Sequence, residues 1–315
     1  MEKTKKTADR TGVMRAVVFI LLFFVLFHCV SVVLEEKRYR DSMAAFYAEP
    51  KNSLDVLLMG SSHLHNGVSA VQLEEEYGVR VNNFAQNGQV LSQTWYALQE
   101  ALRYQEPKVV VLDVYKVVQD SLINSPVAMH YTADFMRVGL PKLRMIRDLM
   151  PRGERAEYLF DVIAYHTRGK ELTDADFAPP DTSRKGTETL TGHYVPYDGW
   201  QVLPESVKAP AAEIELYYLD RIVELCRAED IELLLVSVPF TTPEHDELNR
   251  QAVLNGMADY AGEKGLTYLN LMHHVDEMGL DFRTDMADMY HVNAQGMEKV
   301  TAYIGAYLTE HYEFA

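Results

Sequence analysis

Hydrophobic residues follow two alternating patterns through most of this chain. Short continuous apolar runs stop at glycine, proline or acidic residues, whereas longer segments carry apolar residues at every third or fourth position. Runs of the first kind are typical of strands buried in a parallel sheet, and segments of the second kind are typical of amphipathic helices. The predicted strands are residues 56–59, 79–81, 109–112, 231–238 and 266–271, and the predicted helices are residues 68–77, 92–104, 211–230, 249–264 and a last helix from Asn293. This alternation predicts a three-layer α/β domain, with about five parallel strands between helices on both faces.

One apolar segment is too long for a strand. Residues 16–34 contain no Asp, Glu, Lys or Arg, and a helix of this length reaches about 30 Å, enough to cross a bilayer. A cleaved signal peptide would have a shorter apolar core and a small-residue cleavage site, so we predict an uncleaved transmembrane anchor. The alternative is an apolar helix in the core of a soluble domain. Residues 1–15 form a basic leader, which favours a cytoplasmic N-terminus and places the chain from Glu35 onward outside the membrane.

The rest of the chain divides into a spacer and one large domain. Residues 35–52 are polar and charged with scattered aromatic residues, and we predict a helical stalk. Residues 53–315 form the predicted α/β domain, whose strand–helix rhythm stops over about residues 121–210. We predict that this interval is a partly helical insertion near the active edge of the sheet, because segments this long between strands are usually functional. A disordered surface excursion is less favoured, because aromatic residues persist throughout it.

Charge and cysteine content narrow the class of protein. The formal net charge is −16 and the sequence pI is about 5.1, which excludes a typical nucleic-acid partner. Two cysteines, Cys29 and Cys226, cannot form a disulfide framework, and we interpret Cys226 as a small core residue.

A serine turn follows the first predicted strand. The apolar run at residues 56–59 ends at Gly60, which is followed by Ser61, Ser62 and His63. The carboxyl ends of the strands in an open α/β sheet are where ligands bind. A serine lifted out of the strand at this edge has backbone N–H groups beside it that can stabilise an oxyanion, as an acyl-transfer nucleophile needs. Alone, the signal is weak, because glycine and serine are ordinary turn residues.

The C-terminal region supplies a candidate base. Asp288 and His291 are three residues apart, just before the last predicted helix. At that spacing a carboxylate can accept the imidazole Nδ1–H, which leaves Nε2 free to take a proton from a serine. The alternative is a surface Asp–His pair at a helix start.

The serine turn and the Asp–His pair together resemble the SGNH, or GDSL-type, hydrolases. Gly60-Ser61-Ser62 resembles the Gly-Asp-Ser of the first block, with Ser61 replacing the aspartate. Asp288-Met289-Tyr290-His291, followed by Val292-Asn293-Ala294-Gln295-Gly296, closely resembles the fifth block. Residues 83–88 resemble the second block, whose glycine is Gly88. The resemblance implies a three-layer, flavodoxin-like fold, with Ser62 as nucleophile, His291 as base and Asp288 as its orienter. It also implies that the N–H groups of Ser62 and Gly88 form the oxyanion hole.

One block of that family is missing. The family has Gly-x-Asn-Asp after the third strand, and its asparagine side chain donates to the oxyanion, but residues 112–115 read Leu-Asp-Val-Tyr. Losing one such donor raises the barrier by about 2.7–4 kcal/mol. Either Asn87, Tyr115 or an insertion residue substitutes for the asparagine, or the enzyme is slow, or the chain is not an enzyme. We predict that Asn87 belongs to the oxyanion hole with Ser62 and Gly88.

The layout resembles the cell-envelope branch of the family, which includes the D-alanyl transfer protein of teichoic-acid modification and the polysaccharide O-acetyltransferases. This resemblance implies a single-pass cell-membrane protein whose extracytoplasmic domain is a serine esterase or O-acyltransferase for acyl esters of an envelope glycan or glycopolymer. The implied partners are the bilayer through residues 16–34, an envelope polysaccharide or acyl donor, and a membrane acyltransferase. The alternatives are a non-catalytic envelope protein for binding or assembly, and a lipid esterase or thioesterase at the bilayer surface. No cofactor is expected, and neither the His63/His65 pair nor the His273/His274 pair has the further ligands of a metal site.

Overall fold

The computed structural model describes residues 10–37, 39–194, 202–241 and 245–314. Residues 1–9 of the predicted basic leader lie outside this range. The chain divides into two compact units. The anchor unit comprises Met1–Lys37 and Arg152–Pro179, and the sheet unit comprises Arg38–Pro151 and Pro180–Ala315. We describe each unit by itself.

The sheet unit is built on five parallel strands in the order β2-β1-β3-β4-β5. The strands are β1 (Val56–Met59), β2 (Val81–Asn83), β3 (Val109–Asp113), β4 (Glu232–Ser237) and β5 (Thr267–Asn270). The predicted fold class, an α/β protein with a five-stranded parallel sheet, is therefore confirmed. Every residue of β1 and β3 is buried, as expected for the inner strands of a sheet covered on both faces.

β2 begins two residues later than predicted. The reason is the end of the preceding helix, α4 (Ala70–Tyr77), which is capped by Gly78 in the left-handed region. The N–H of Val79 donates to the carbonyl of Leu73 at 3.2 Å, so Val79 completes the helix cap and cannot yet pair with β1. Its hydrophobic side chain therefore marks a helix end here and not a strand start.

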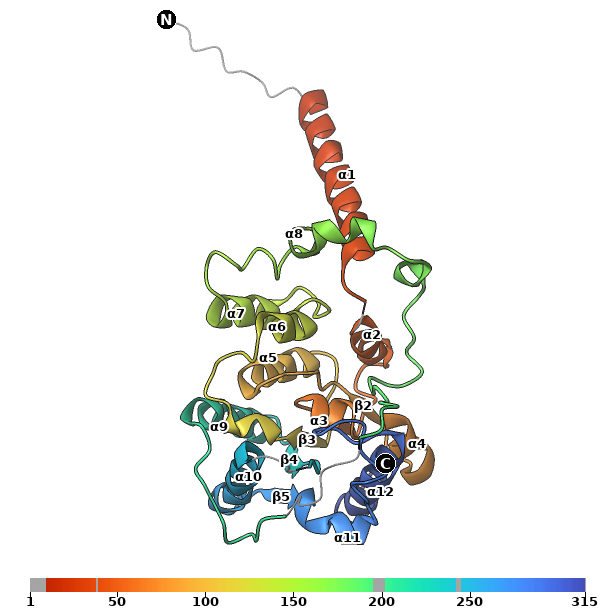
Figure 1. Ribbon diagram of the computed structural model, residues 1–315. Coiled ribbons are helices and arrows are strands. Elements are labelled where there is room, and N and C mark those ends of the chain that lie inside the picture. Colours follow the sequence, from red (N-terminus) through yellow and green to blue (C-terminus); the bar gives the residue numbers. More distant parts are fainter. Residues whose placement is uncertain (1–9, 38, 195–201, 242–244, 315) are drawn as a thin grey trace, which may run out of the picture. The chain divides into compact units, whose positions relative to one another are not determined.

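Helices cover both faces of the sheet (Figure 1). α4 leads from β1 to β2, whereas α5 (Leu91–Ala101), α9 (Glu213–Ala228) and α10 (His245–Lys264) lead toward the opposite edge. Crossovers between parallel strands are right-handed, so connections that run in opposite directions along the sheet lie on opposite faces. α4 therefore lies on one face of the sheet, and α5, α9 and α10 lie on the other. The last helix, α12 (Ala294–His311), packs against α4, and α5 packs against α9. The last helix starts where predicted, and Asn293 caps it, since its side chain accepts from the N–H groups of Gln295 and Gly296.

The segment predicted as a stalk is different in the structure. Residues 35–52 contain α2 (Arg40–Ala48), a helix with four buried residues. The Phe46 ring lies 4.3 Å from the Phe84 ring, and the Tyr47 hydroxyl donates to Glu100 of α5 at 3.0 Å. The sheet unit therefore starts at Arg38 and not at residue 53. The charged residues on both sides of the short apolar segment of α2 give residues 35–52 the composition of an exposed spacer.

The predicted insertion at about residues 121–210 is divided between the two units. Its first part forms α6 (Pro126–Ala133) and α7 (Leu140–Leu149) in the sheet unit, where α7 packs on α5. The Gln93 side chain donates to the Ala128 carbonyl at 3.1 Å, and the Tyr96 hydroxyl donates to Asp148 at 2.7 Å. Arg152–Pro179 belongs to the anchor unit and contains the short helix α8 (Asp161–Tyr165).

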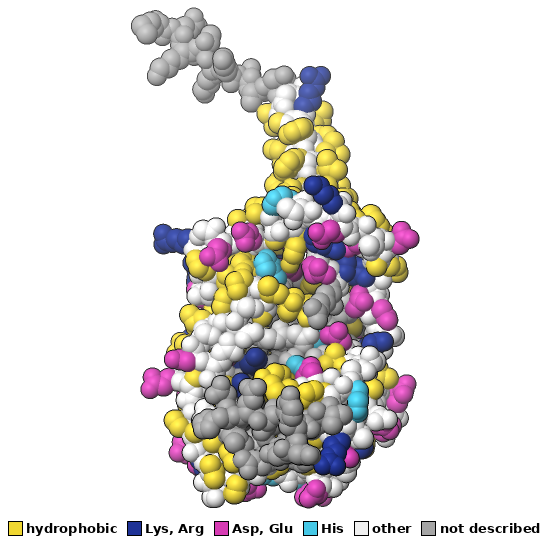
Figure 2. Space-filling model, in the orientation of Figure 1, with side chains coloured by type: hydrophobic (Ala, Val, Ile, Leu, Met, Phe, Trp, Pro, Cys, Tyr) yellow, Lys and Arg dark blue, Asp and Glu magenta, His cyan; other side chains and the backbone are white. Residues whose placement is uncertain are grey.

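The anchor unit is dominated by α1 (Arg10–Leu34). Its segment Thr11–Leu34 is long and apolar enough to cross a membrane, and hydrophobic side chains cover its surface (Figure 2). Near its C-terminal end the Phe27 ring contacts the Phe160 ring edge-on, with centroids 5.9 Å apart. The Arg168 guanidinium donates to the carbonyl oxygens of Leu34 and Glu35 and also binds Asp176. These contacts satisfy carbonyl groups that the end of a helix leaves without partners.

Candidate active site

The turn after β1 has room only for glycine. Gly60 has φ +128°, and a Cβ there would lie 2.8 Å from Cβ of Asp113 on the neighbouring strand β3. A side chain at this position would therefore meet both strain and a clash. The close approach lets the chain leave the sheet sharply and start the short helix α3 (Ser62–His65).

The two serines of the turn have different partners. Ser61 is 1% exposed, and both its hydroxyl and its N–H donate to the Asp113 carboxylate. Burial raises the pKa of Asp113, while the hydrogen bonds from Ser61 and from the Tyr115 N–H oppose that rise. Ser61 also caps α3 by accepting from the His63 N–H. Ser61 and Asp113 therefore fix the turn, and Ser62 is left as the serine that faces the predicted base.

The structure brings the three predicted catalytic side chains together. Ser62 Oγ lies 2.7 Å from His291 Nε2, and His291 Nδ1 lies 2.9 Å from each carboxylate oxygen of Asp288. Burial alone would raise the pKa of Asp288, but the hydrogen bond and charge of His291 and the backbone N–H groups of Tyr290 and His291 lower it. Asp288 is therefore an ionised acceptor. A charged carboxylate at Nδ1 keeps the proton there and leaves Nε2 as the acceptor for the serine proton.

The loop that carries Asp288 and His291 is fixed at both ends. An antiparallel bridge pairs Met286 with Val292, and the Thr241 hydroxyl donates to the Met289 carbonyl at 2.8 Å. Asp285 does not contact the histidine. It is 2% exposed at its side chain and forms an ion pair with Lys299 of α12 at 2.7 Å. The ordering of this loop before substrate binds is what an acid–base pair needs for correct alignment.

Two backbone donors lie at the edge where an oxyanion would form. Within the part of the chain that the structure describes, no acceptor pairs with the N–H of Ser62 or of Gly88. Gly88 has φ +71°, and a Cβ there would lie 2.9 Å from Cβ of Ala128 in α6. Glycine at this position thus lets the loop turn and the insertion approach it closely.

The side chain of Asn87, the third predicted oxyanion donor, has other partners. Its amide nitrogen donates to the Tyr39 hydroxyl at 3.0 Å and to Glu188 at 3.3 Å, and its oxygen accepts from Asn66 at 3.1 Å. An amide nitrogen has two hydrogens to donate, so both are used. Asn87 would have to break one of these bonds before it could reach an oxyanion.

The insertion supplies an amide that the sequence analysis did not single out. Nδ2 of Asn124 lies 2.9 Å from the point where a Gly88 Cβ would be, and no described residue accepts from it. Asn124 comes after β3, as the missing asparagine block does, but eleven residues beyond Asp113 and without a flanking motif. Its position beside Gly88 identifies Asn124 as a candidate oxyanion donor.

An aromatic layer lies behind the base. The His63 ring stacks on Tyr115 at 3.5 Å and lies 5.2 Å from the His291 ring. Burial, followed by the charges of His291, Lys116 and Arg250, lowers the pKa of His63 well below its usual range. His63 is therefore neutral, and its ring lies beside the His291 ring. Among the described residues no group of three His, Cys, Asp or Glu side chains is placed to hold a metal ion.

Comparisons with known proteins give structural neighbours only. No family model and no curated protein matches the chain. A GDSL-like lipase from Bacteroides thetaiotaomicron is 13% identical, with a TM-score of 0.43 over 88% of this chain and 100% of that chain. TesA is 11% identical, with a TM-score of 0.40 over 81% of this chain and 97% of that chain. An acetyl xylan esterase from Butyrivibrio proteoclasticus is 10% identical, with a TM-score of 0.31 over 83% of this chain and 65% of that chain.

The neighbours include GDSL-like lipases and an acylhydrolase. With TM-scores below 0.5 these likenesses carry no weight for the chemistry.

Proposed function

We propose that this chain is a membrane-anchored serine esterase or O-acyltransferase of SGNH type. The observation that carries the proposal is the hydrogen-bonded series from Ser62 through His291 to Asp288, with contacts of 2.7 and 2.9 Å. A non-catalytic binding protein has no need for a serine, an imidazole and a carboxylate aligned in this way. The contact between Ser62 and His291 therefore supports the enzyme over the binding module.

The reaction starts with attack of Ser62 Oγ on the carbonyl carbon of an acyl ester, while His291 Nε2 takes the serine proton. Asp288 stabilises the imidazolium that forms. The N–H groups of Ser62 and Gly88 stabilise the tetrahedral oxyanion. Collapse of this intermediate breaks the bond to the alcohol oxygen, which leaves with the proton from His291. The product is an acyl ester on Ser62.

The second half of the reaction returns the serine. A water molecule or an acceptor hydroxyl gives its proton to His291 and attacks the acyl carbonyl. The second tetrahedral intermediate then releases Ser62 Oγ, which takes the proton back. Water yields a free acid and an acceptor hydroxyl yields a new ester, so one site performs hydrolysis or transfer according to which nucleophile reaches it.

Asn124 is our candidate for the third oxyanion donor in place of Asn87. Its amide nitrogen is beside Gly88 and has no described acceptor, whereas both amide hydrogens of Asn87 are already used. A third donor would replace the asparagine side chain that the family supplies after the third strand.

The setting of the reaction is part of the proposal. Residues 16–34 cross the cell membrane once, the leader is cytoplasmic, and the sheet unit is extracytoplasmic. The acyl group comes from or goes to a cell-envelope glycan or glycopolymer, and a membrane acyltransferase is the expected partner. Support comes from the apolar length of α1 and the resemblance to the envelope branch of the family.

Turnover of a small acetyl ester by the full chain in detergent tests the activity. Ser62→Ala should remove turnover, because no other hydroxyl contacts His291 Nε2 among the described residues. Ser61→Ala should retain a measurable rate, because Ser61 only fixes the turn. Equal turnover by Ser62→Ala and the unmodified chain would contradict the proposal.

A further inference from the structure

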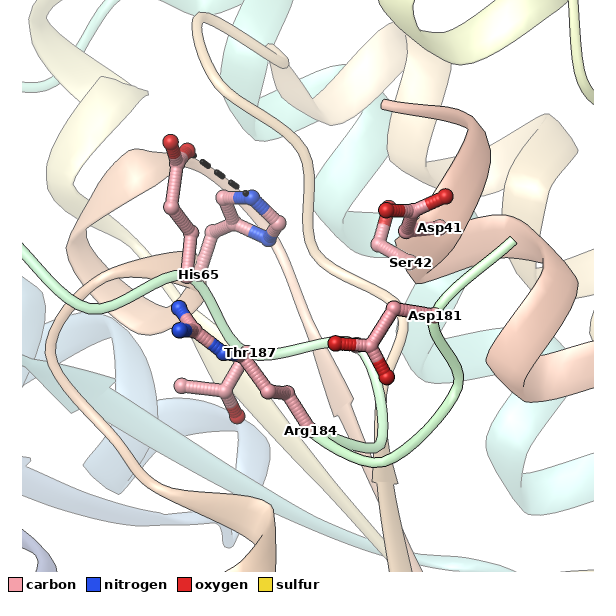
Figure 3. A pocket seen from close by; sticks show the side chains of 8 residues that line it. Asp41, Ser42, His65, Asp181, Arg184 and Thr187 are labelled. Atoms are coloured by element: carbon pink, nitrogen blue, oxygen red, sulfur yellow. Dashed lines mark ion pairs between the residues drawn. The ribbon is translucent and has the colours of Figure 1, made fainter. Parts of the chain in front are cut away.

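A polar cavity of about 300 Å³ lies beside the short helix that carries Ser62. It is lined by α2, α3 and the loop that follows Pro180, and Figure 3 shows the two sides of the cavity. Asp41, Ser42 and Asp181 lie on one side, and His65, Arg184 and Thr187 lie on the other. Except for Gly186, every lining residue has a polar side chain.

The loop over the cavity is held in place by the sheet unit. The N–H of Asn83 in β2 donates to the Lys185 carbonyl at 2.8 Å, and the N–H of Glu188 donates to the His65 carbonyl at 3.0 Å. Gly186 has φ +88°, and a Cβ there would lie 1.9 Å from the Asn83 carbonyl oxygen. Only glycine permits this approach, so the cavity wall is built before any ligand arrives.

His65 presents a buried atom without a partner. The side chain is 2% exposed, and its Nε2 lies 3.5 Å from Glu188. Nδ1 has no hydrogen-bond partner, and in Figure 3 the ring turns that nitrogen toward the cavity. Buried polar groups are nearly always hydrogen-bonded, so the wall of the cavity contains a polar atom whose hydrogen bond is not made within the described residues.

The cavity is connected to the proposed catalytic turn. Ser62 and His65 are the first and last residues of α3, about one helical turn apart. Asn66 follows and donates to Asn87, and Asn87 donates to Glu188 in the cavity wall. A ligand bound to Glu188 would therefore be linked by hydrogen bonds to Asn87, the residue before Gly88.

The lining distinguishes between classes of ligand. Ser42 and Thr187 already use their hydroxyls in bonds to Tyr39, Gln86, Val68 and Ala70. The remaining groups are three carboxylates, one guanidinium and one imidazole. This set offers no apolar wall for an acyl chain, and its excess of carboxylates repels an anion. Closely spaced hydroxyls, which both donate and accept, match it best.

We propose that this cavity is a sugar subsite, which holds one neutral or amino-substituted ring of the glycan next to the ring whose ester reacts. Arg184 and His65 contact ring or hydroxyl oxygens, and Asp41, Asp181 and Glu188 accept from hydroxyl or amino groups. This inference rests on the proposed function for the identity of the ligand, but binding at the cavity does not require a chemical step.

Calorimetric titration of the full chain in detergent, with the background substitution Ser62→Ala, tests the subsite. The probes are tetrasaccharides of N-acetylglucosamine, of glucosamine and of galacturonic acid. Arg184→Ala and Asp181→Asn change exposed lining residues, and Arg144→Ala on α7 is the matched control, because it removes an exposed arginine outside the cavity.

The neutral or the amino tetrasaccharide should bind, and the acidic one should bind at least tenfold more weakly. Arg184→Ala and Asp181→Asn should each weaken binding at least tenfold, and Arg144→Ala should leave it unchanged. Absence of binding by all three probes, preference for the acidic probe, or equal affinity of Arg184→Ala and Arg144→Ala would overturn the inference. Arg184-dependent binding in a chain that has no esterase activity when Ser62 is intact would support the subsite and count against the proposed function.

Discussion

At the scale of single residues, the proposed chemistry depends on a division of roles between His291 and Asp288. His291 transfers the proton, so His291→Ala should lower kcat by about 10⁴–10⁶. Asp288 orients the ring and its side chain is 52% exposed, so water can replace part of its effect. Asp288→Ala should therefore cost less, about 10²–10⁴ in kcat, and the double variant should be little worse than His291→Ala. Acetyl-ester kinetics of the three variants check this.

Asp285 is the control for that experiment. It lies near His291 in sequence but pairs with Lys299 on α12. Because one partner is buried and the other is partly exposed, Asp285→Ala should lower the free energy of unfolding by about 1–3 kcal/mol while the folded protein keeps its kcat. A large loss of kcat in Asp285→Ala together with a silent Asp288→Ala would reassign the acid of the triad.

The oxyanion hole gives a second prediction at this scale. Asn124→Ala should lower kcat by about 10²–10³ with little change in KM, because a donor to the oxyanion acts only in the transition state. Asn124→Asp is the matched variant, since it keeps the shape and replaces the amide donor with a carboxylate. Unchanged kcat in both variants would show that the backbone N–H groups of Ser62 and Gly88 act without Asn124.

The sequence predicted some of these residues and not others, for a physical reason. Ser62, Asp288 and His291 belong to short motifs, and the structure brings them within hydrogen-bonding distance. The bond between Ser61 and Asp113 joins the turn after β1 to the end of β3, and the approach of Asn124 to Gly88 depends on how the insertion folds. Neither of these two contacts involves a recognisable motif, so no spacing rule predicts them.

At the scale of secondary-structure elements, a buried acid joins α9 to α5. Glu215 is 1% exposed and accepts from the Leu91 N–H at 2.9 Å, and burial raises its pKa to about 8. In the unfolded chain the pKa is near 4.5. Between pH 4.5 and about pH 8, Glu215 is ionised in the unfolded chain and neutral in the folded protein. Its contribution to stability is therefore complete below pH 4.5 and is lost as the pH rises through 8.

Thermal unfolding of Glu215→Gln against the unmodified chain measures this effect. The melting temperature of the variant relative to the unmodified chain should rise steadily from pH 5 to pH 8 and then level off. Glu213→Gln, an exposed change on the same helix, should show no such trend. A difference between Glu215→Gln and the unmodified chain that is constant over this range would contradict the assignment of a neutral, buried Glu215.

Elements were easier to predict than their packing. Short apolar runs predict the strands, because both faces of β1 and β3 are buried. The sequence does not predict that α2 belongs to the sheet unit, because charged residues flank its short apolar segment, although Phe46 packs on Phe84. The sequence also does not predict that the insertion divides between the two units. The contact of Phe160 with Phe27 joins residues that are more than a hundred positions apart.

At the scale of the whole molecule, the proposed topology predicts which parts a protease reaches. Protease added to intact cells should digest the sheet unit and leave a tag at the N-terminus protected, because the leader is basic and α1 is long enough to span the membrane. The same tag should be digested when the membrane is permeabilised. Protection of the sheet unit in intact cells would contradict the topology.

The central claim is that Ser62 forms the acyl-enzyme, and covalent labelling tests it most directly. The full chain is treated with a serine-directed fluorophosphonate, and the adduct is mapped by peptide mass spectrometry. We expect one adduct, on Ser62, and slow or absent labelling in His291→Ala, because His291 Nε2 is the base 2.7 Å from the hydroxyl. An adduct on Ser61, or no adduct on the folded chain, would contradict it.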